Sequence, residues 1–416
     1  MQKLQWCCTL ILSSTCALSQ TQAPLTWEKV RERFEQRNPT LLAGKLNIDE
    51  SRVQEITAFL RPNPSLDLAV DQIDPFNGGP AHSTFGSLLT VASASYLYER
   101  QQKRELRLQS AQQGTAIALS SQSDLERNLL FSLRGAFVQI LQGKAVLNMA
   151  RETLAYYDHV LDISRDRFRA GDLAQIDLDR LELQRLQFES DLQTAEVDLR
   201  TAKIQLLMFL NDRTPVEQFE VTGPFDFSDR LPALDEFRKI ASDTRPDLRA
   251  AAQAVDKART DHKLAVANGS TDPSLGFDVG RNPPIDQYIG FSVSIPLRVF
   301  DRNQGEKLRT QLDIDRNQRL LDAAQAQVFS DVDSSYAMVT SNLILLRPYR
   351  EKYLQQAVRV RDTVTFAYQN GGASLLDFLS AENDYRGVQL NYLDLVGAYL
   401  ISASQLNLAV GREVIP

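Results

Sequence analysis

The chain carries two copies of one sequence plan, and this duplication strongly limits the folds open to it. The copies lie about 200 to 209 residues apart and their pieces follow in the same order. We therefore divide the chain into a first structural repeat, residues 20–231, and a second, residues 232–416. The matching pieces are Asn38-Pro39-Thr40-Leu41 with Arg245-Pro246-Asp247-Leu248, Pro64-Ser65-Leu66 with Pro273-Ser274-Leu275, Phe168-Arg169-Ala170-Gly171-Asp172 with Tyr368-Gln369-Asn370-Gly371-Gly372, Asp177 with Asp377, and Glu182 with Glu382.

Each repeat reads as a helix, two strands, a very long helix, a turn and a closing helix. A helix of about 65 residues spans on the order of 100 Å, which indicates a fibrous or tubular body. Pro348 lies inside the second long helix and should kink or break it. The expected ranges are helix 27–60, β-hairpin 65–98, long helix 104–168, turn 169–175, helix 176–211 and a linker, then helix 235–267, β-hairpin 274–297, long helix 304–368, turn 369–375 and helix 376–412.

The closing helices have the apolar spacing of a coiled coil. In the first repeat this stripe follows a 3-4 alternation, and the second repeat has the equivalent stripe with a neighbouring one beside it. Two adjacent stripes predict packing on two sides of the helix, although an ordinary bundle core gives the same pattern. The stripes are Leu192, Ala195, Leu199, Ala202, Leu206 and Phe209, then Tyr392, Leu395, Tyr399, Ser402, Leu406 and Ala409, with Leu393, Val396, Leu400 and Ala403 alongside.

The strand-like runs alternate apolar with small or polar residues. The clearest places Ile289, Phe291 and Val293 between Gly290 and Ser292. Such strands suit an outer-membrane barrel, and a soluble sheet packed on helices is the alternative. Four strands cannot close a membrane barrel, and open edges are not tolerated in lipid, so several chains must share one. The predicted fold is mainly α with a β-barrel: a tandem-repeat protomer of long coiled-coil helices and two β-hairpins, contributing four strands to a trimeric twelve-stranded barrel.

The N-terminus has the pattern of a signal peptide, residues 1–19. Lys3 precedes a short apolar stretch, and small residues before Gln20 predict cleavage between Ser19 and Gln20. Cys16 is an alternative lipidation site, although the residues before it lack the aliphatic side chain of a lipobox. All three cysteines lie in the first sixteen residues, so the mature chain is expected to be exported and free of disulfides.

The composition argues against several functional classes. The chain has 46 basic and 53 acidic residues, a net charge of −7, and no basic patch, so nucleic-acid binding is not expected. His82, His159 and His262 are scattered, which leaves no evident metal site. No nucleotide-binding glycine loop, HExxH, CxxC or GxSxG motif is present. We expect no catalytic residue and no cofactor, and the chain is not predicted to be an enzyme.

Three segments together resemble TolC-type outer membrane efflux proteins over nearly the whole mature sequence. The resemblance implies a homotrimer whose outer-membrane barrel continues as a helical tunnel across the periplasm. It also implies docking onto a periplasmic adaptor (membrane fusion) protein and an inner-membrane pump of the resistance-nodulation-division class. The string from Asp301 to Gly305 favours the heavy-metal cation efflux branch. The segments are Leu25-Thr26-Trp27-Glu28 through Arg37-Asn38-Pro39, Phe291–Leu297 leading to Phe300-Asp301-Arg302-Asn303-Gln304-Gly305-Glu306, and Tyr368-x-x-Gly371 with Ser374–Leu379 and Val410-Gly411.

By the same resemblance, the helical hairpin turns would form the periplasmic tip that the adaptor grips. The first turn carries Gly171 and Asp172, and the second carries Gly371 and Gly372. Glycine there has a second explanation, since helix C-caps favour a positive φ.

The channel entrance is expected in the second turn. Asp377 lies where the family often narrows its entrance with an acidic ring, and an N-capping role is the alternative. Ala373 occupies the place where an arginine can latch the closed state with Tyr368, and Ser380 stands where a second acidic residue can lie. We therefore do not expect the family's arginine contact to close the entrance of this chain. Hydrophobic packing near Leu375, Leu376 and Phe378 is the alternative means of closure.

Two further functions stay open at this level. The same fold also serves as a duct for type I protein secretion. The third hypothesis is a periplasmic coiled-coil scaffold without a pore. Such a scaffold does not explain why two hairpins of alternating strands lie between the long helices.

Overall fold

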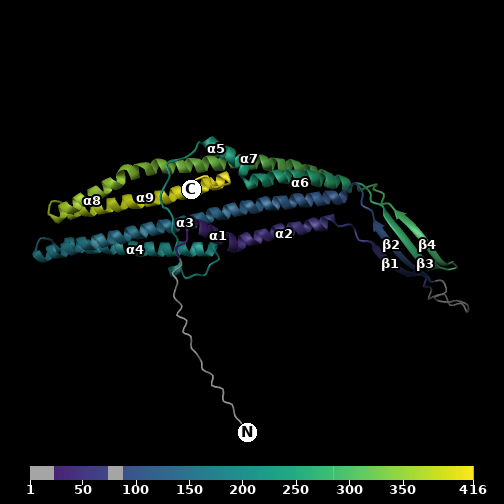
Figure 1. Cartoon of the computed structure of the whole chain (residues 1–416), viewed down its shortest axis with the longest axis horizontal. Helices are drawn as coiled ribbons and strands as arrows, with labels where there is room; N and C mark the ends of the chain where they lie inside the picture. The colour runs from purple at the N-terminus through teal and green to yellow at the C-terminus, as the bar shows by residue number, and fades with distance from the viewer. Residues whose placement is uncertain (1–22, 74–87, 284, 416) are drawn as a thin grey trace, which may run out of the picture. The chain divides into compact units, whose positions relative to one another are not determined.

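The structure is a computed structural model that describes residues 23–73, 88–283 and 285–415 (Figure 1). The predicted signal peptide, its cleavage site at Ser19 and Gln20, Cys16 and His82 lie outside these residues. The elements are α1 (Trp27–Arg37), α2 (Pro39–Phe59), β1 (Ser65–Asp71), β2 (Leu89–Leu97), α3 (Lys103–Ala170), α4 (Gln175–Phe209), the 3-10 turn η1 (Val216–Gln218), α5 (Leu234–Thr244), α6 (Pro246–Asn268), β3 (Ser274–Asn282), β4 (Ile285–Ser294), α7 (Gln304–Pro348), the π-helical turn η2 (Tyr349–Tyr353), α8 (Leu354–Gln369) and α9 (Leu375–Val410).

The chain forms two compact units that do not follow the two sequence repeats. Among the described residues, one unit contains 23–34 and 139–224, and the other contains 35–73, 88–138, 225–283 and 285–415. The second unit thus holds the first hairpin together with the whole second repeat. The division into repeats stays a prediction about the origin of the elements.

The opening helix expected in each repeat is divided into two helices in the structure: α1 and α2 in the first repeat, and α5 and α6 in the second. The prediction of single helices over 27–60 and 235–267 is wrong, because a proline in each favours extended backbone at the preceding residue. Asn38 has φ −67° and ψ 118°, and Arg245 has φ −66° and ψ 123°. Asn38 then caps α2, since its Oδ1 accepts the Leu41 N–H at 3.0 Å.

The first long helix is unbroken and the second is interrupted. α3 has no proline and runs through 68 residues. After Pro348 the helical pattern changes to the π-helical turn η2 before α8 resumes it. A proline removes one backbone donor and crowds the preceding turn, so the interruption predicted there is present.

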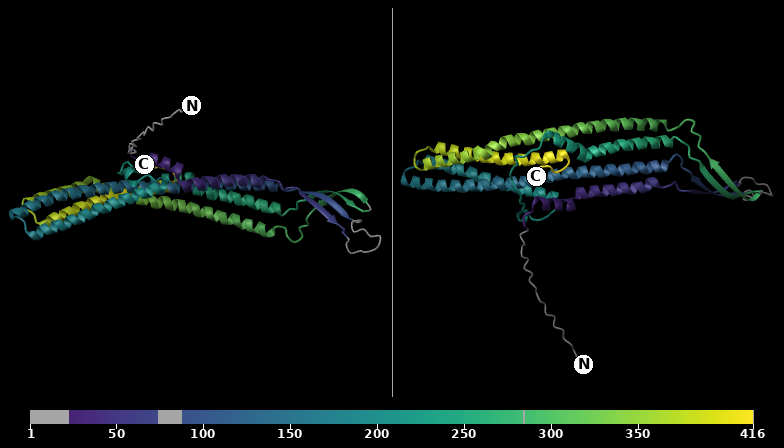
Figure 2. Two further views of the ribbon diagram at one scale, coloured as in Figure 1. Left: turned by 90° about the horizontal axis from the view of Figure 1, so that it is seen from below. Right: turned by 45° about the horizontal axis from the view of Figure 1, so that its top comes forward.

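One antiparallel sheet joins both hairpins in the order β1-β2-β3-β4 (Figure 2). The central pair, β2 with β3, connects strands that are far apart in sequence, with Ala94 opposite Phe277. In the same row, Leu66 pairs with Ala94 and Phe277 pairs with Phe291. The apolar residues therefore share one face. β1 and β4 each have a free long edge within the described sheet.

The predicted helical stripes form the cores. On α4, Ala195, Leu199, Ala202 and Leu206 are buried. On α9, the parallel stripes supply Val396, Tyr399, Leu400, Ala403 and Leu406 to a core shared with α5 and α7. α9 is long and apolar enough to cross a membrane by composition, but 56% of that window is buried in the protein. The prediction of a mainly helical chain with two β-hairpins is confirmed.

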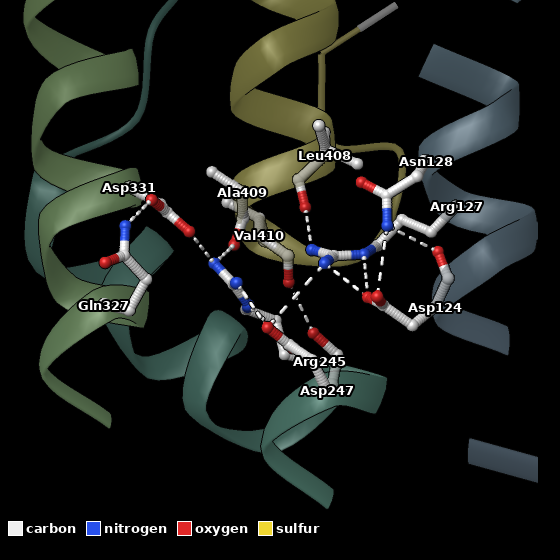
Figure 3. A network of polar contacts seen from close by, with 11 residues as sticks. Asp124, Arg127, Asn128, Arg245, Asp247, Gln327, Asp331, Leu408, Ala409 and Val410 are labelled. Atoms are coloured by element: carbon white, nitrogen blue, oxygen red, sulfur yellow. Dashed lines mark hydrogen bonds and ion pairs between the residues drawn. The ribbon is translucent and has the colours of Figure 1, made fainter. Parts of the chain in front are cut away.

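A buried arginine holds the end of α9 (Figure 3). The Arg245 side chain, only 4% exposed, donates to Asp331 at 2.8 Å and to Asp247 at 3.0 Å. It also donates to the Ala409 carbonyl at 3.2 Å, one of the acceptors that a helix end leaves without an intrahelical partner. Burial lowers the pKa of Arg245, but the hydrogen bonds to both aspartates outweigh it and hold the pKa above its ordinary value.

Neighbouring side chains satisfy two more carbonyls of α9. Arg127 of α3 donates to the Leu408 carbonyl and to Asp124. The Thr244 hydroxyl donates to the Val410 carbonyl at 2.6 Å. The network therefore connects α3, α5, α6 and α7 to the C-terminal end of α9.

Replacing Arg245 by alanine should lower the free energy of unfolding by about 3 kcal/mol, because two carboxylates and a carbonyl lose a buried donor. Loss of the helical circular-dichroism signal on heating the detergent-solubilised protein measures the effect. The control is Arg259→Ala, since Arg259 pairs with Asp256 on the surface and is 57% exposed. Equal effects of the two substitutions would show that the network contributes nothing beyond an exposed ion pair.

Candidate functional site

The turn between α8 and α9 reverses the chain at a glycine in the left-handed region. Gly371 has φ +75°, where an L side chain is strained. Its N–H donates to the Tyr368 carbonyl at 3.1 Å, and the Gly372 N–H donates to the Ala367 carbonyl at 2.7 Å. These bonds satisfy the last carbonyls of α8, so the glycine-cap explanation of this turn has direct structural support.

The turn between α3 and α4 repeats this geometry. Gly171 has φ +84°, and its N–H donates to the Phe168 carbonyl at 3.0 Å. The Asp172 N–H donates to the Arg167 carbonyl at 2.8 Å. The same glycine at the same offset therefore makes the same turn in both hairpins.

Asp377 is part of the start of α9. Ser374 is the N-cap, and its hydroxyl oxygen accepts the Asp377 N–H at 3.2 Å. In return, the Asp377 carboxylate accepts the Ser374 hydroxyl at 2.7 Å and the Ser374 N–H at 3.1 Å. These hydrogen bonds hold the pKa of Asp377 below its ordinary value, the hydroxyl contributing first. The capping alternative thus takes a specific form: Asp377 is the third residue of α9 and the acidic partner of Ser374 in a capping box, and its side chain remains exposed.

The first repeat has the aspartate without the capping box. Asp177 is likewise the third residue of its helix, but Ala174 stands at the N-cap and offers no side-chain bond. The Asp177 carboxylate instead forms an ion pair with Arg180, with Oδ1 3.6 Å from Nη1. The capping box belongs to the second hairpin, where the entrance was expected.

The other predicted entrance residues differ in exposure. Tyr368 is buried and its ring stacks on Phe378, with centroids 5.0 Å apart and an interplanar angle of 16°. Leu375 is buried beneath the turn, whereas Leu376 is 77% exposed. Ala373 is half-buried in the turn and Ser380 is exposed on α9. The structure thus brings Tyr368, Ala373 and Asp377 to one end of one hairpin.

The sequence patterns do not single out Glu382, which the structure buries. Its sequence match to Glu182 gives no information on burial, yet Glu182 is exposed and Glu382 is only 2% exposed. One sequence difference could have indicated it. Arg165 pairs with Glu182 in the first repeat, but position 365, which is 200 residues later, is a threonine and offers Glu382 no positive charge.

The sheet presents two chemically different faces. One carries large apolar side chains in open exposure: Leu68 is 75% exposed, Ile289 67% and Phe291 84%. The other carries small and acidic residues, with Asp67, Ser93 and Asp278 in one cross-strand row. An exposed apolar sheet face of this extent requires a lipid or protein cover.

A buried ion pair anchors the sheet to the helices. Lys103, at the start of α3, donates to Asp272 at 2.6 Å and to the Ser270 carbonyl at 3.0 Å. Burial raises the pKa of Asp272, but the Lys103 and Arg100 hydrogen bonds bring it below its ordinary value. Asn303 occupies the equivalent place before α7 and donates to the Ala265 carbonyl at 2.8 Å. Its string from Asp301 to Gly305 therefore has a structural task at a helix start.

Within the described ranges, no group of three or more histidine, cysteine, aspartate or glutamate side chains is arranged to hold a metal ion.

Comparison with known proteins points to one family. Residues 238–412 match the family model described as outer membrane efflux protein. The chain is 21% identical over 398 residues to the cobalt-zinc-cadmium resistance protein CzcC of Cupriavidus metallidurans, covering 94% of this chain and 90% of the relative. It is 24% identical over 356 residues to the pyoverdine export outer membrane protein OpmQ of Pseudomonas aeruginosa, covering 82% of this chain and 71% of the relative.

A solved structure has the same fold. The chain aligns with CusC, studied for conformational changes during folding and transmembrane channel formation, at a TM-score of 0.78 and 18% identity. The alignment covers 93% of this chain and 92% of that one.

Alanine at Gly371 should destabilise the turn by about 1 kcal/mol through its positive φ, since the space around it is open. Hydrogen exchange of the amides in the first turn of α9 should then be about fivefold faster. Gly372→Ala is the matched control: an added Cβ there meets the Ala367 carbonyl oxygen at 3.5 Å, an ordinary contact. If both variants exchange alike, the left-handed backbone is not what makes Gly371 necessary.

Proposed function

We propose that this chain belongs to the outer membrane efflux protein family and works as a homotrimer in a tripartite efflux system. It is an efflux exit channel of the outer membrane, and its helices project into the periplasm. Three copies would pool their strands in a twelve-stranded barrel and conduct substrates passively to the exterior.

The sheet is the observation that supports the proposed assembly. Its apolar face is exposed, and β1 and β4 each leave one edge unpaired in the described sheet. Unpaired backbone groups are not tolerated in lipid, and a neighbouring copy supplies the missing partner at each edge. Closure by three copies would turn the apolar face to outer membrane lipid and the row with Asp67 and Asp278 to the lumen.

The proposed partners are a periplasmic adaptor protein and an inner-membrane pump of the resistance-nodulation-division class. The turns at Gly171-Asp172 and Gly371-Gly372 would supply the adaptor-docking tip. A heavy-metal cation is the proposed substrate, by likeness to a relative named for cobalt, zinc and cadmium resistance. We propose no nucleic-acid partner, no cofactor and no catalytic step. A signal peptide cleaved between Ser19 and Gln20 would direct export.

Fractionation, sizing in detergent and planar-bilayer conductance on one sample test this function. We expect an outer-membrane trimer with discrete, cation-selective openings. Asp377→Asn should lower the cation selectivity if three Asp377 carboxylates converge at the entrance. A water-soluble monomer or dimer without conductance would favour the scaffold. Export of a protein substrate in cells, lost on deletion, would favour the type I secretion duct.

Ala373→Arg should lower the single-channel conductance, since three guanidinium groups would crowd an aperture at the α8–α9 turn. The effect is read in planar bilayers at equal protein loading. Leu173→Arg is the matched control, because Leu173 occupies the equivalent place in the α3–α4 turn. Unchanged conductance in Ala373→Arg would place the narrowest point elsewhere.

A further inference from the structure

Glu382 is a buried acid whose carboxyl lacks full hydrogen bonding. The residue is 2% exposed, and its Oε1 has no hydrogen-bond partner among the residues that the structure describes. A charged carboxylate in such a place loses its hydration without replacement, which is strongly unfavourable. The neutral acid fits the site better.

The charges that act on Glu382 come from α8, the helix that packs along this part of α9 within its unit. Arg361 attracts the carboxylate, but its Nε and Nη2 donate to Asp362 at 2.9 and 2.8 Å. The Arg361 guanidinium also lies over the Tyr385 ring, 4.1 Å from its centroid. On α9 itself, Asp384 adds a negative charge and Arg386 a positive one within about one turn.

Burial raises the pKa of Glu382 to about 7, with Arg361 opposing this and Asp362 adding to it. The folded-state pKa thus lies above that of an unfolded chain. Stability from the neutral acid is therefore fully present below about pH 4.5, falls as the pH rises from there, and is lost above about pH 7.

The first repeat lacks this arrangement at the equivalent place. Glu182 is exposed and accepts a hydrogen bond from Arg165 at 3.1 Å. In the second repeat Thr365 stands at the arginine's place, and its hydroxyl donates to the Arg361 carbonyl at 2.8 Å. Where the first hairpin has a surface ion pair, the second has a buried acid with no ion-pair partner among the residues that the structure describes.

Glu382 lies close to the packing that holds this hairpin end together. Phe378 is one helical turn before it on α9, is fully buried, and stacks on Tyr368. The Tyr368 carbonyl accepts the Gly371 N–H, so this residue belongs both to the ring stack and to the cap of the turn. Residues four apart on a helix share one face, so water drawn to a charged Glu382 enters next to Phe378 and the ring stack.

We propose that Glu382 is a proton-operated latch of the α8–α9 hairpin: its neutral carboxyl keeps the end of the hairpin packed, and release of its proton loosens that end. This goes beyond the proposed function, because the latch is a property of one hairpin and needs no conducting channel. In the assembled duct, the same loosening would make the hairpin end that carries Ala373 and Asp377 respond to periplasmic pH.

Hydrogen exchange of the full chain in detergent tests the latch at about pH 5.5 and about pH 8.5, on either side of the expected titration. After correction for intrinsic exchange rates, amides from the α8–α9 end should exchange at least about tenfold faster at the higher pH. Infrared difference spectra should show a protonated carboxyl band at the lower pH that Glu382→Gln removes.

Two variants and a control make the outcome decisive. Glu382→Gln and Glu382→Met carry no titrating group, so both should exchange equally at the two pH values. Glu182→Gln, at the exposed equivalent place, should behave like the wild type. The proposal is overturned if the wild type shows no pH difference at this end, or if the two Glu382 variants keep it. Neither readout depends on conductance, so a failed latch and a failed duct give different results.

Discussion

The ionic contacts of Arg245 hold together the unit that contains the sheet and the second hairpin. Its guanidinium bonds Asp247 of α6, Asp331 of α7 and the Ala409 carbonyl of α9. Since α9 is the helix around which the apolar core of that unit forms, fixing its C-terminal end sets the register of Val396, Tyr399 and Leu406 against α7. The opposite end of α9 begins at the candidate entrance turn, so one rigid helix links the anchored core to the functional end.

The two hairpins follow one plan but differ in their local contacts. Gly171 and Gly371 make the same turn, but only the second hairpin has the Ser374–Asp377 capping box. Likewise Glu182 makes an exposed ion pair with Arg165, whereas Glu382 is buried and its Oε1 has no hydrogen-bond partner in the described part of the chain. The two turns thus match in backbone geometry, whereas the side chains that follow them differ. These differences have a physical consequence. The start of α9 is held by a capping box and has a buried acid two turns later, whereas the start of α4 has neither.

Much of the fold was readable before the structure. The strands were recognised by alternation in runs such as Ile289 to Val293, and the closing helices by their heptad spacing, because both periods follow from local backbone geometry. The turn glycines were readable because a positive φ excludes most other residues. The prediction of single helices over 27–60 and 235–267 is wrong, because Pro39 and Pro246 favour extended backbone at Asn38 and Arg245 more strongly than the apolar pattern favours a continuous helix.

Local sequence patterns were enough to predict most of the helices and strands and their apolar faces, since each depends on residues only a few positions apart. Contacts between distant segments could be established from the three-dimensional structure alone. It joined β2 to β3, paired Arg245 with Asp331, and placed Glu382 away from water. Burial and ion pairing depend on what distant chain covers a side chain, and no local pattern records that. The acid at position 182 and the acid at 382 have the same side chain, and their surroundings alone give them different chemistry.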